Sequence, residues 1–158
     1  MIGTEKKDAL IIAEAVRLVN EGVSVTFPVN GRSMLPFIVG GRDSVILEKS
    51  GSLQIGDVVL AQVVSGDCEN LDTAEKHYVV HRIVALNGEN VTLMGDGNLA
   101  LREYCNRTDV CAKVICVVKP NGKRCSMSAW HSRIAAKIWY ILLPVRRYLL
   151  WIYRKVKK

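Results

Sequence analysis

The first twenty residues carry apolar side chains at helical spacing. Apolar residues recur every three or four positions, at Ala9, Ile12, Ala13, Val16 and Val19. Residues at this spacing share one face of an α-helix. The tripeptide Asn20-Glu21-Gly22 then ends the pattern with side chains that favour a turn. The sequence therefore predicts one amphipathic helix over residues 1–22.

From residue 23 onward the pattern changes to short runs of β-branched residues separated by turn-forming residues. Such runs are typical of strands in an antiparallel sheet. Asn87-Gly88-Glu89-Asn90 lies between two runs and predicts a hairpin turn. The polar stretch 65–76 predicts a mobile surface loop. We therefore expect a mainly β, antiparallel domain over residues 23–120, with strands at 23–29, 44–48, 58–64, 77–86, 91–94 and 110–118.

Helical periodicity returns in residues 121–158. Ser126 or Ser128 could cap a helix that continues to the end of the chain, and Pro144 is expected to kink it. The most apolar stretch, 138–153, is 16 residues long and includes two arginines. A membrane-spanning helix needs about 20 apolar residues, and each central arginine costs about 3 kcal/mol or more. We therefore predict a long amphipathic C-terminal helix that does not span a membrane.

The charge of the chain is divided between its two parts. The net charge is +7, and residues 119–158 hold 11 Lys or Arg and no Asp or Glu, which leaves 11 basic and 15 acidic residues before them. A basic field confined to one segment indicates an anionic partner for that segment, either phospholipid or nucleic acid.

The aromatic residues of the tail favour the phospholipid. They lie within apolar runs and do not alternate with basic residues as in nucleic-acid binders, so no nucleic acid is expected. Basic and aromatic residues together are typical of a helix lying on an anionic membrane surface. Packing of the helix on the β domain or on a partner protein is the alternative. The aromatic residues are Trp130, Trp139, Tyr140, Tyr148, Trp151 and Tyr153.

Composition limits the compartment and the cofactors. A chain of 158 residues with 49% hydrophobic and 23% charged residues suits one globular domain. Its five cysteines form no CxxC pair and no zinc-type spacing with histidine, so we expect a reducing compartment, no metal and no cofactor. Residues 1–7 are polar and lead into a charged amphipathic segment, unlike a secretory signal. A cytoplasmic protein, peripheral at the membrane, is the expectation.

Three motifs supply the side chains of a serine hydrolase. Gly31-Arg32-Ser33-Met34-Leu35-Pro36 offers a serine, His81-Arg82-Ile83 follows 48 positions later with a base, and Gly95-Asp96-Gly97-Asn98 adds a carboxylate. A serine hydroxyl is a poor nucleophile until a neighbouring base takes its proton and a third group fixes that base. Ser33, His81 and Asp96 are therefore the candidate catalytic residues.

With Arg42-Asp43-Ser44-Val45 and Gly56-Asp57-Val58-Val59, these motifs resemble, in order, the successive boxes of the signal peptidase I and LexA-type repressor superfamily. The resemblance covers residues 27–98. It implies a signal-peptidase/LexA-like β fold in which Ser33 is the nucleophile and its backbone N–H is the main oxyanion donor. The base is lysine in bacterial signal peptidases and LexA-type repressors. Here it falls on His81, as in the branch that contains the endoplasmic-reticulum and archaeal signal peptidases.

The chemistry of the base agrees with this resemblance. A catalytic lysine must lose more than two pKa units to work near neutral pH, whereas an ordinary imidazole titrates near pH 6.5. Without the other boxes, His81 would be interpreted as a hydrogen-bonded histidine in an apolar strand.

The carboxylate is less specific. Asp96 matches the family's carboxylate near the dyad, but it would equally suit an Asx-turn. The histidine branch carries another acidic residue six positions on, where this chain has Arg102 followed by Glu103. Glu103 is therefore a second candidate for orienting His81.

The resulting hypothesis is a serine endopeptidase that cleaves an extended peptide, such as a signal or leader peptide. An extended substrate would fit an exposed sheet edge. The alternative is a non-catalytic module on the same fold that binds peptides or membranes. LexA-type self-cleavage is disfavoured because residues 1–22 offer one helix, too little for a helix-turn-helix DNA reader.

Overall fold

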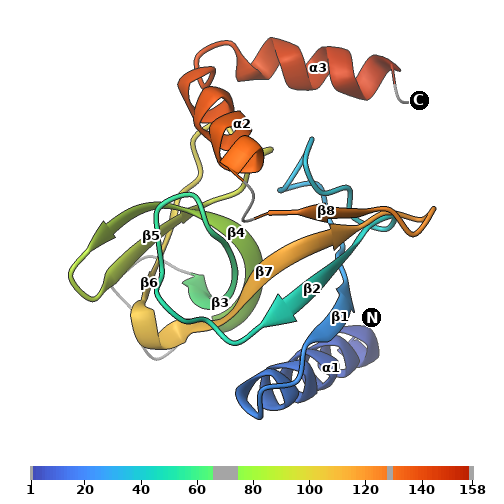
Figure 1. Ribbon diagram of the computed structural model, residues 1–158, viewed down its shortest axis with the longest axis vertical. Helices are drawn as coiled ribbons and strands as arrows, with labels where there is room; N and C mark the ends of the chain where they lie inside the picture. Colours follow the sequence, from blue (N-terminus) through green and yellow to red (C-terminus); the bar gives the residue numbers. More distant parts are fainter. Residues whose placement is uncertain (1, 66–74, 128–129, 157–158) are drawn as a thin grey trace.

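The computed structural model describes residues 2–65, 75–127 and 130–156 and shows a mainly β protein. An antiparallel eight-stranded sheet has the order β1-β2-β7-β3-β4-β5-β6, with β8 paired to β7 (Figure 1). The strands are β1 (Val25–Pro28), β2 (Ser44–Glu48), β3 (Val58–Ser65), β4 (Glu75–Asn87), β5 (Asn90–Met94), β6 (Glu103–Asn106), β7 (Val110–Val118) and β8 (Arg124–Ser126).

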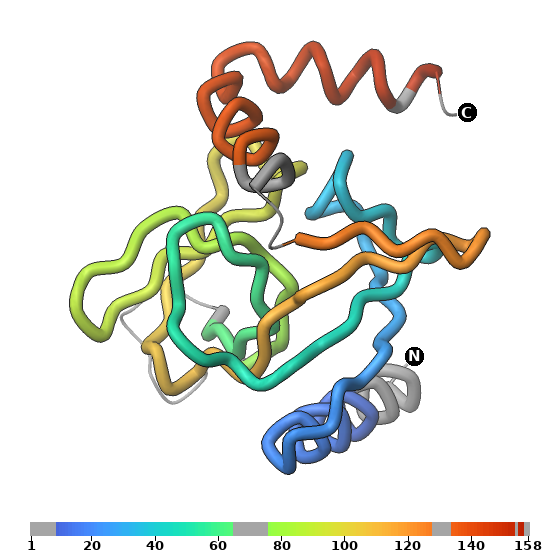
Figure 2. The backbone as a smooth tube through the Cα atoms, in the orientation of Figure 1, coloured from blue at the N-terminus to red at the C-terminus, as the bar shows by residue number. Residues whose placement is uncertain are grey.

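Three α-helices accompany the sheet. They are α1 (Ile2–Asn20), α2 (Trp130–Ile141) and α3 (Arg146–Val156), and a 3-10 turn, η2 (Arg107–Asp109), precedes β7. The tube in Figure 2 shows α1 at one end of the molecule and the α2–α3 pair at the other. Within the described residues, none of these helices combines the length and the apolar character needed to cross a bilayer.

Most predicted elements are confirmed, with two short strands missed. The amphipathic helix at the start of the chain is α1, and the predicted hairpin turn joins β4 to β5, where Asn87 pairs with Asn90. Neither β6 nor β8 was predicted, because each has only three or four residues and alternates half-buried with exposed positions. The predicted mobile loop falls largely on residues 66–74, which lie outside the described part of the chain.

The long C-terminal helix that was predicted is two helices. The chain leaves α2 at Ile141 and begins α3 at Arg146, and Pro144 lies in the intervening turn. Proline lacks the backbone N–H that would continue the helical hydrogen bonds, and its ring disfavours helical geometry in the residue before it. In place of the kink predicted at Pro144, the chain therefore has a break between two helices that run in different directions (Figure 1).

The core lies on both faces of the central strand β3. Val58 and Leu60 belong to one cluster of buried side chains, whereas Val59, Ala61 and Val63 belong to another. Successive residues of a strand point to opposite faces, so a strand covered on both faces is apolar throughout. Strand β4 pairs with this buried strand and is therefore fixed in position. It carries His81 and Arg82. The first cluster also includes Val19 of α1 and Met34 and Ile38 of the segment between β1 and β2.

Candidate active site

Ser33 lies in a loop between β1 and β2 that is fixed by hydrogen bonds at its ends and by buried side chains in its middle. The ends of the loop are joined by hydrogen bonds from Gly41 N–H to Val29 O, 2.7 Å, and from Val29 N–H to Asp43 O, 3.2 Å. Met34 and Ile38 are 2% and 1% exposed and fix the middle of the loop in the core. The Ser33 side chain is half-buried on the fixed loop.

Asp43 fastens the end of this loop to the sheet. Its carboxylate accepts hydrogen bonds from Val39 N–H (2.9 Å), from Arg42 (2.8 Å) and from Lys119 on the β7–β8 turn (2.7 Å). Burial alone would raise the pKa of the Asp43 carboxyl, but these hydrogen bonds outweigh burial and lower it to about 2. The Arg42-Asp43 motif of the sequence therefore stabilises the end of the Ser33 loop.

The Gly95-Asp96-Gly97-Asn98 turn packs directly against Ser33. Gly97 N–H donates to the Ser33 carbonyl oxygen at 2.6 Å. A Cβ on Gly95 would lie 2.5 Å from that same oxygen, and a Cβ on Gly97 would lie 2.6 Å from Arg32 O. Real Cβ atoms do not approach backbone atoms so closely, so both glycines are required for the two loops to meet.

His81 is buried on β4 and is held by a carboxylate. Its side chain is 6% exposed, and its Nδ1 lies 2.5 Å from Glu103 Oε2 at the start of β6. With a carboxylate on Nδ1, the imidazole keeps its proton on that nitrogen and presents Nε2 as the proton acceptor. His77, four residues earlier on β4, places its Nε2 4.0 Å from Glu103 Oε1. Glu103 is therefore shared by two histidines.

Asp96, which was expected to hold His81, binds Arg82 through both of its oxygens. Arg82 Nε donates to Oδ1 at 2.8 Å and Arg82 Nη2 donates to Oδ2 at 2.7 Å, and both side chains are buried. A third bond joins Arg82 Nη1 to Gly56 O at 2.7 Å. The histidine contact assigned to Asp96 from the sequence is made instead by Glu103, the second candidate.

Ser33 and His81 are brought to the same end of the sheet. Met94 pairs with Arg82 in the β4–β5 register, so Gly95 falls beside His81. Ser33 O lies against Gly95 from the loop side. Among the hydrogen bonds of the described residues, none joins the Ser33 hydroxyl to His81, and none uses the Ser33 N–H.

A cavity of about 270 Å³ opens beside Ser33. The edge strand β1 forms one wall and the helix α1 another, so its apolar lining combines distant parts of the chain. No sequence pattern indicates that α1 contributes to this cavity, because the packing of a helix on a sheet is a tertiary contact. The apolar lining includes Ile11, Ile12, Phe27, Leu60, Tyr78 and Val80.

Two cysteines, Cys105 and Cys111, lie half-buried in the sheet. Burial raises the pKa of Cys105 to about 11 and also raises the pKa of Cys111, so both remain thiols near neutral pH. Among the described residues, no group of three or more His, Cys, Asp or Glu could hold a metal ion.

Comparisons of the chain with protein-family models, with curated proteins and with solved structures give no match.

Proposed function

We propose that this protein is a serine endopeptidase in which Ser33 is the nucleophile and His81 is the general base. The observation that carries the proposal is the 2.5 Å contact between Glu103 and the Nδ1 atom of a buried histidine. This contact sets the tautomer that a general base needs, and Ser33 lies on a fixed loop at the same end of the sheet. Glu103 acts as the positioning residue for His81.

In the reaction, the Ser33 hydroxyl attacks the scissile carbonyl carbon while His81 Nε2 takes the hydroxyl proton. The tetrahedral intermediate collapses as His81 returns that proton to the leaving amine, which leaves an acyl group on Ser33. Water, activated by the same nitrogen, then releases the acid. The negative charge on the intermediate's oxygen requires a preorganised donor, and the Ser33 N–H is available for this because no hydrogen bond of the described residues uses it.

The proposed substrate is an extended peptide such as a signal or leader peptide. Strand β1 is at the end of the strand order and leads through Val29 and Asn30 into the Ser33 loop. A peptide pairing with the free edge of β1 would run toward Ser33 and place an apolar side chain in the adjoining cavity.

We propose a signal-peptidase/LexA-like fold for this sheet. The supporting observation is that the sequence boxes, far apart along the chain, contact one another. Arg82 joins Gly56 O to Asp96, and the next residue, Gly97, binds Ser33 O. Asp57 pairs with Lys113 of β7 at 2.8 Å.

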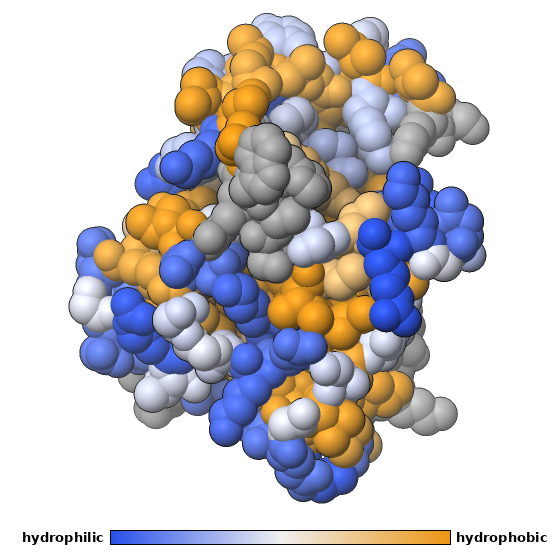
Figure 3. Space-filling view, in the orientation of Figure 1, coloured by the Kyte–Doolittle hydropathy of each residue, from blue (hydrophilic) through white to orange (hydrophobic). Residues whose placement is uncertain are grey.

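We further propose that α2 and α3 hold the protein peripherally at an anionic membrane on the cytoplasmic side. Figure 3 shows apolar side chains gathered over these helices. Exposed fractions are 52% for Ile138, 75% for Ile141 and 60% for Trp151, and the same segment is strongly basic. Apolar side chains beside basic ones suit the interface of an anionic bilayer.

The test is digestion of a synthetic peptide mixture, with products detected by mass spectrometry. Ser33→Ala and His81→Ala should each abolish nearly all turnover, and the double variant should lose little more, because the two groups act as one unit. Ser52→Ala removes an exposed serine hydroxyl and is the matched control. Wild-type turnover in Ser33→Ala would overturn the proposal, and the absence of turnover in the wild type would favour a non-catalytic peptide-binding module.

A further inference from the structure

The two C-terminal helices contact the turn that packs on Ser33. Trp139 Nε1–H of α2 donates to Asp96 O at 2.7 Å. Arg146, the first residue of α3, donates from Nη1 to Asn98 O at 3.0 Å and from Nη2 to Trp139 O at 2.8 Å. One residue from each helix therefore binds the backbone of residues 95–98.

Arg146 is an unusual residue for such a contact. It is 2% exposed, and its described hydrogen bonds go to carbonyl oxygens, with no ion pair to a carboxylate among the described residues. Burial lowers the pKa of its guanidinium, and its Nε atom is buried with no hydrogen-bond partner. Burying a charge in this way is unfavourable unless the contact brings a compensating advantage. The guanidinium also stacks 5.3 Å from the centre of the Trp139 ring.

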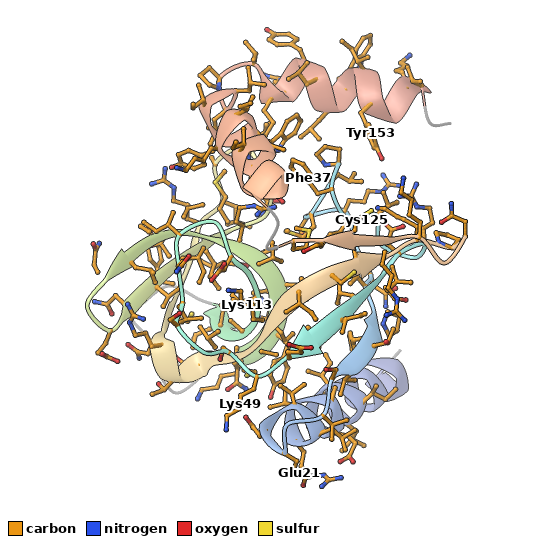
Figure 4. All side chains as sticks on the ribbon, viewed as in Figure 1. Glu21, Phe37, Lys49, Lys113, Cys125 and Tyr153 are labelled. Carbon is orange, nitrogen blue, oxygen red and sulfur yellow. The ribbon has the colours of Figure 1, made fainter. Side chains whose placement is uncertain are left out.

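The contacts of Trp139 and Arg146 involve both loops that meet at Ser33, namely residues 95–98 and the loop between β1 and β2. Gly97 lies between the two carbonyls held by Trp139 and Arg146, and its own N–H donates to Ser33 O at 2.6 Å. The Trp139 ring also meets Phe37, in the Ser33 loop, edge-to-face at 6.0 Å between centroids. Figure 4 shows Phe37 beside the lower end of α2, between the C-terminal helices and the sheet.

We infer that α2 and α3 form a brace for the Ser33 loop, in which Trp139 and Arg146 are positioning residues. They hold residues 95–98 in place, and these residues hold the backbone of Ser33 in the orientation that points its N–H at the developing oxyanion. The catalytic consequence rests on the proposed function, whereas the brace itself does not. A donor displaced by about 1 Å loses much of its value in the transition state but little in substrate binding.

The first experiment measures the brace without using activity. Hydrogen exchange of the Gly97 amide is followed by NMR in the full-length protein and in Trp139→Phe, which keeps an aromatic ring but removes the donor. Arg146→Met is the second variant. Trp151→Phe and Arg147→Met change exposed neighbours on α3 and are the matched controls. We expect exchange at Gly97 to become about tenfold faster or more in the two brace variants and to stay unchanged in the controls.

The second experiment measures turnover without lipid. In Trp139→Phe and Arg146→Met, kcat should fall by about ten- to a hundredfold while KM changes little. Arg146→Lys keeps one charged donor and should recover part of the loss. Thermal denaturation shows whether each variant is folded, and if Arg146→Met fails to fold, Trp139→Phe decides.

The outcomes separate the two proposals. If Gly97 exchange is unchanged in a folded Trp139→Phe variant, the brace is overturned whatever the activity. If exchange is faster but kcat is unchanged, the positioning role is overturned. If the wild-type protein cleaves no peptide and Gly97 exchange is still faster in the variants, the proposed function fails and the brace stands.

Discussion

His81 and Arg82 are neighbours on β4, and each binds its own carboxylate. Glu103 contacts the imidazole, whereas Asp96 takes two hydrogen bonds from the guanidinium. The two carboxylates therefore have different tasks: one orients a group proposed to exchange protons, and the other neutralises a permanently charged buried group. Substitutions that remove a single charge should separate these tasks.

Glu103→Gln should lower activity with little effect on stability. The amide can still contact His81, but it no longer stabilises the imidazolium that forms during the reaction, so kcat should fall at least about tenfold. Peptide turnover near neutral pH measures the effect, and a normal kcat would separate Glu103 from His81.

Asp96→Asn, in contrast, should mainly lower stability. It leaves the buried Arg82 charge without a charged partner, and breaking a buried ion pair from one side costs about 3 kcal/mol or more. We expect a clear loss in the free energy of unfolding, measured by urea denaturation. A variant as stable as the wild type would contradict the structural role of Asp96.

Asp43 should make stability depend on acid pH. The pKa of its carboxyl is about 2 in the folded protein and near 4 when unfolded. A lowered pKa contributes stability that is complete above pH 4 and is lost as the pH falls from about 4 to about 2, on the order of 2 kcal/mol. In Asp43→Asn this part of the pH dependence should disappear. Denaturation midpoints from pH 2 to 6 measure it, and an unchanged slope would contradict the prediction.

The motifs of the sequence name Ser33 and His81 as candidates, but they put Asp96 ahead of Glu103 as the partner of His81. Glu103 lies in β6, a four-residue edge strand with alternating exposure, and such a strand has no clear signal in the sequence. Its place beside His81 follows from the pairing of β6 with β5 and of β5 with β4. Trp139 was likewise predicted as a membrane anchor, because a sequence cannot show which tryptophan of an amphipathic segment faces the domain.

At the level of elements, Gly95→Ala should disturb the contact between the Ser33 loop and the end of β5. The new methyl group would lie 2.5 Å from a backbone oxygen that cannot rotate away. We expect the loops to separate and turnover to fall about tenfold or more, with a lower midpoint of thermal unfolding. Gly51→Ala is the control, because nothing lies within 4 Å of a Cβ there. Equal behaviour of both variants would contradict the close approach.

Over the whole molecule, the basic and apolar surfaces are concentrated at the end opposite α1. The helices α2 and α3 pack inward through Ala136, Arg146 and Leu150, which are at most 5% exposed. Other apolar side chains of these helices are at least 49% exposed, namely Ile138, Ile141, Trp151 and Ile152. The predicted choice between packing and membrane contact is therefore not exclusive. One face of each helix packs on the protein while the other stays available (Figure 3).

Vesicle co-sedimentation should show this division. Trp151→Asp should weaken binding to vesicles rich in phosphatidylglycerol, whereas Leu10→Asp, at a 71% exposed apolar position on α1, should not. High salt should weaken the binding of the wild type, because each basic residue near anionic lipid contributes about 1 kcal/mol that salt screens. Equal loss in both variants, or no preference for anionic lipid, would instead favour a protein partner for this surface.

The register in which β4 pairs with β5 has a chemical consequence, because successive side chains of a strand point to opposite faces. A slip of one residue in an antiparallel pair turns every side chain to the opposite face. Such a slip would put Arg82 instead of His81 opposite Gly95, and so replace, at the proposed site, a base that can give up its proton with a cation that cannot. The hairpin turn prevents the exchange, because Gly88, with a φ of 59°, closes the turn at the Asn87–Asn90 pair and sets the count of residues along both strands. A residue at the far end of the hairpin thus determines which side chain of β4 lies opposite Gly95.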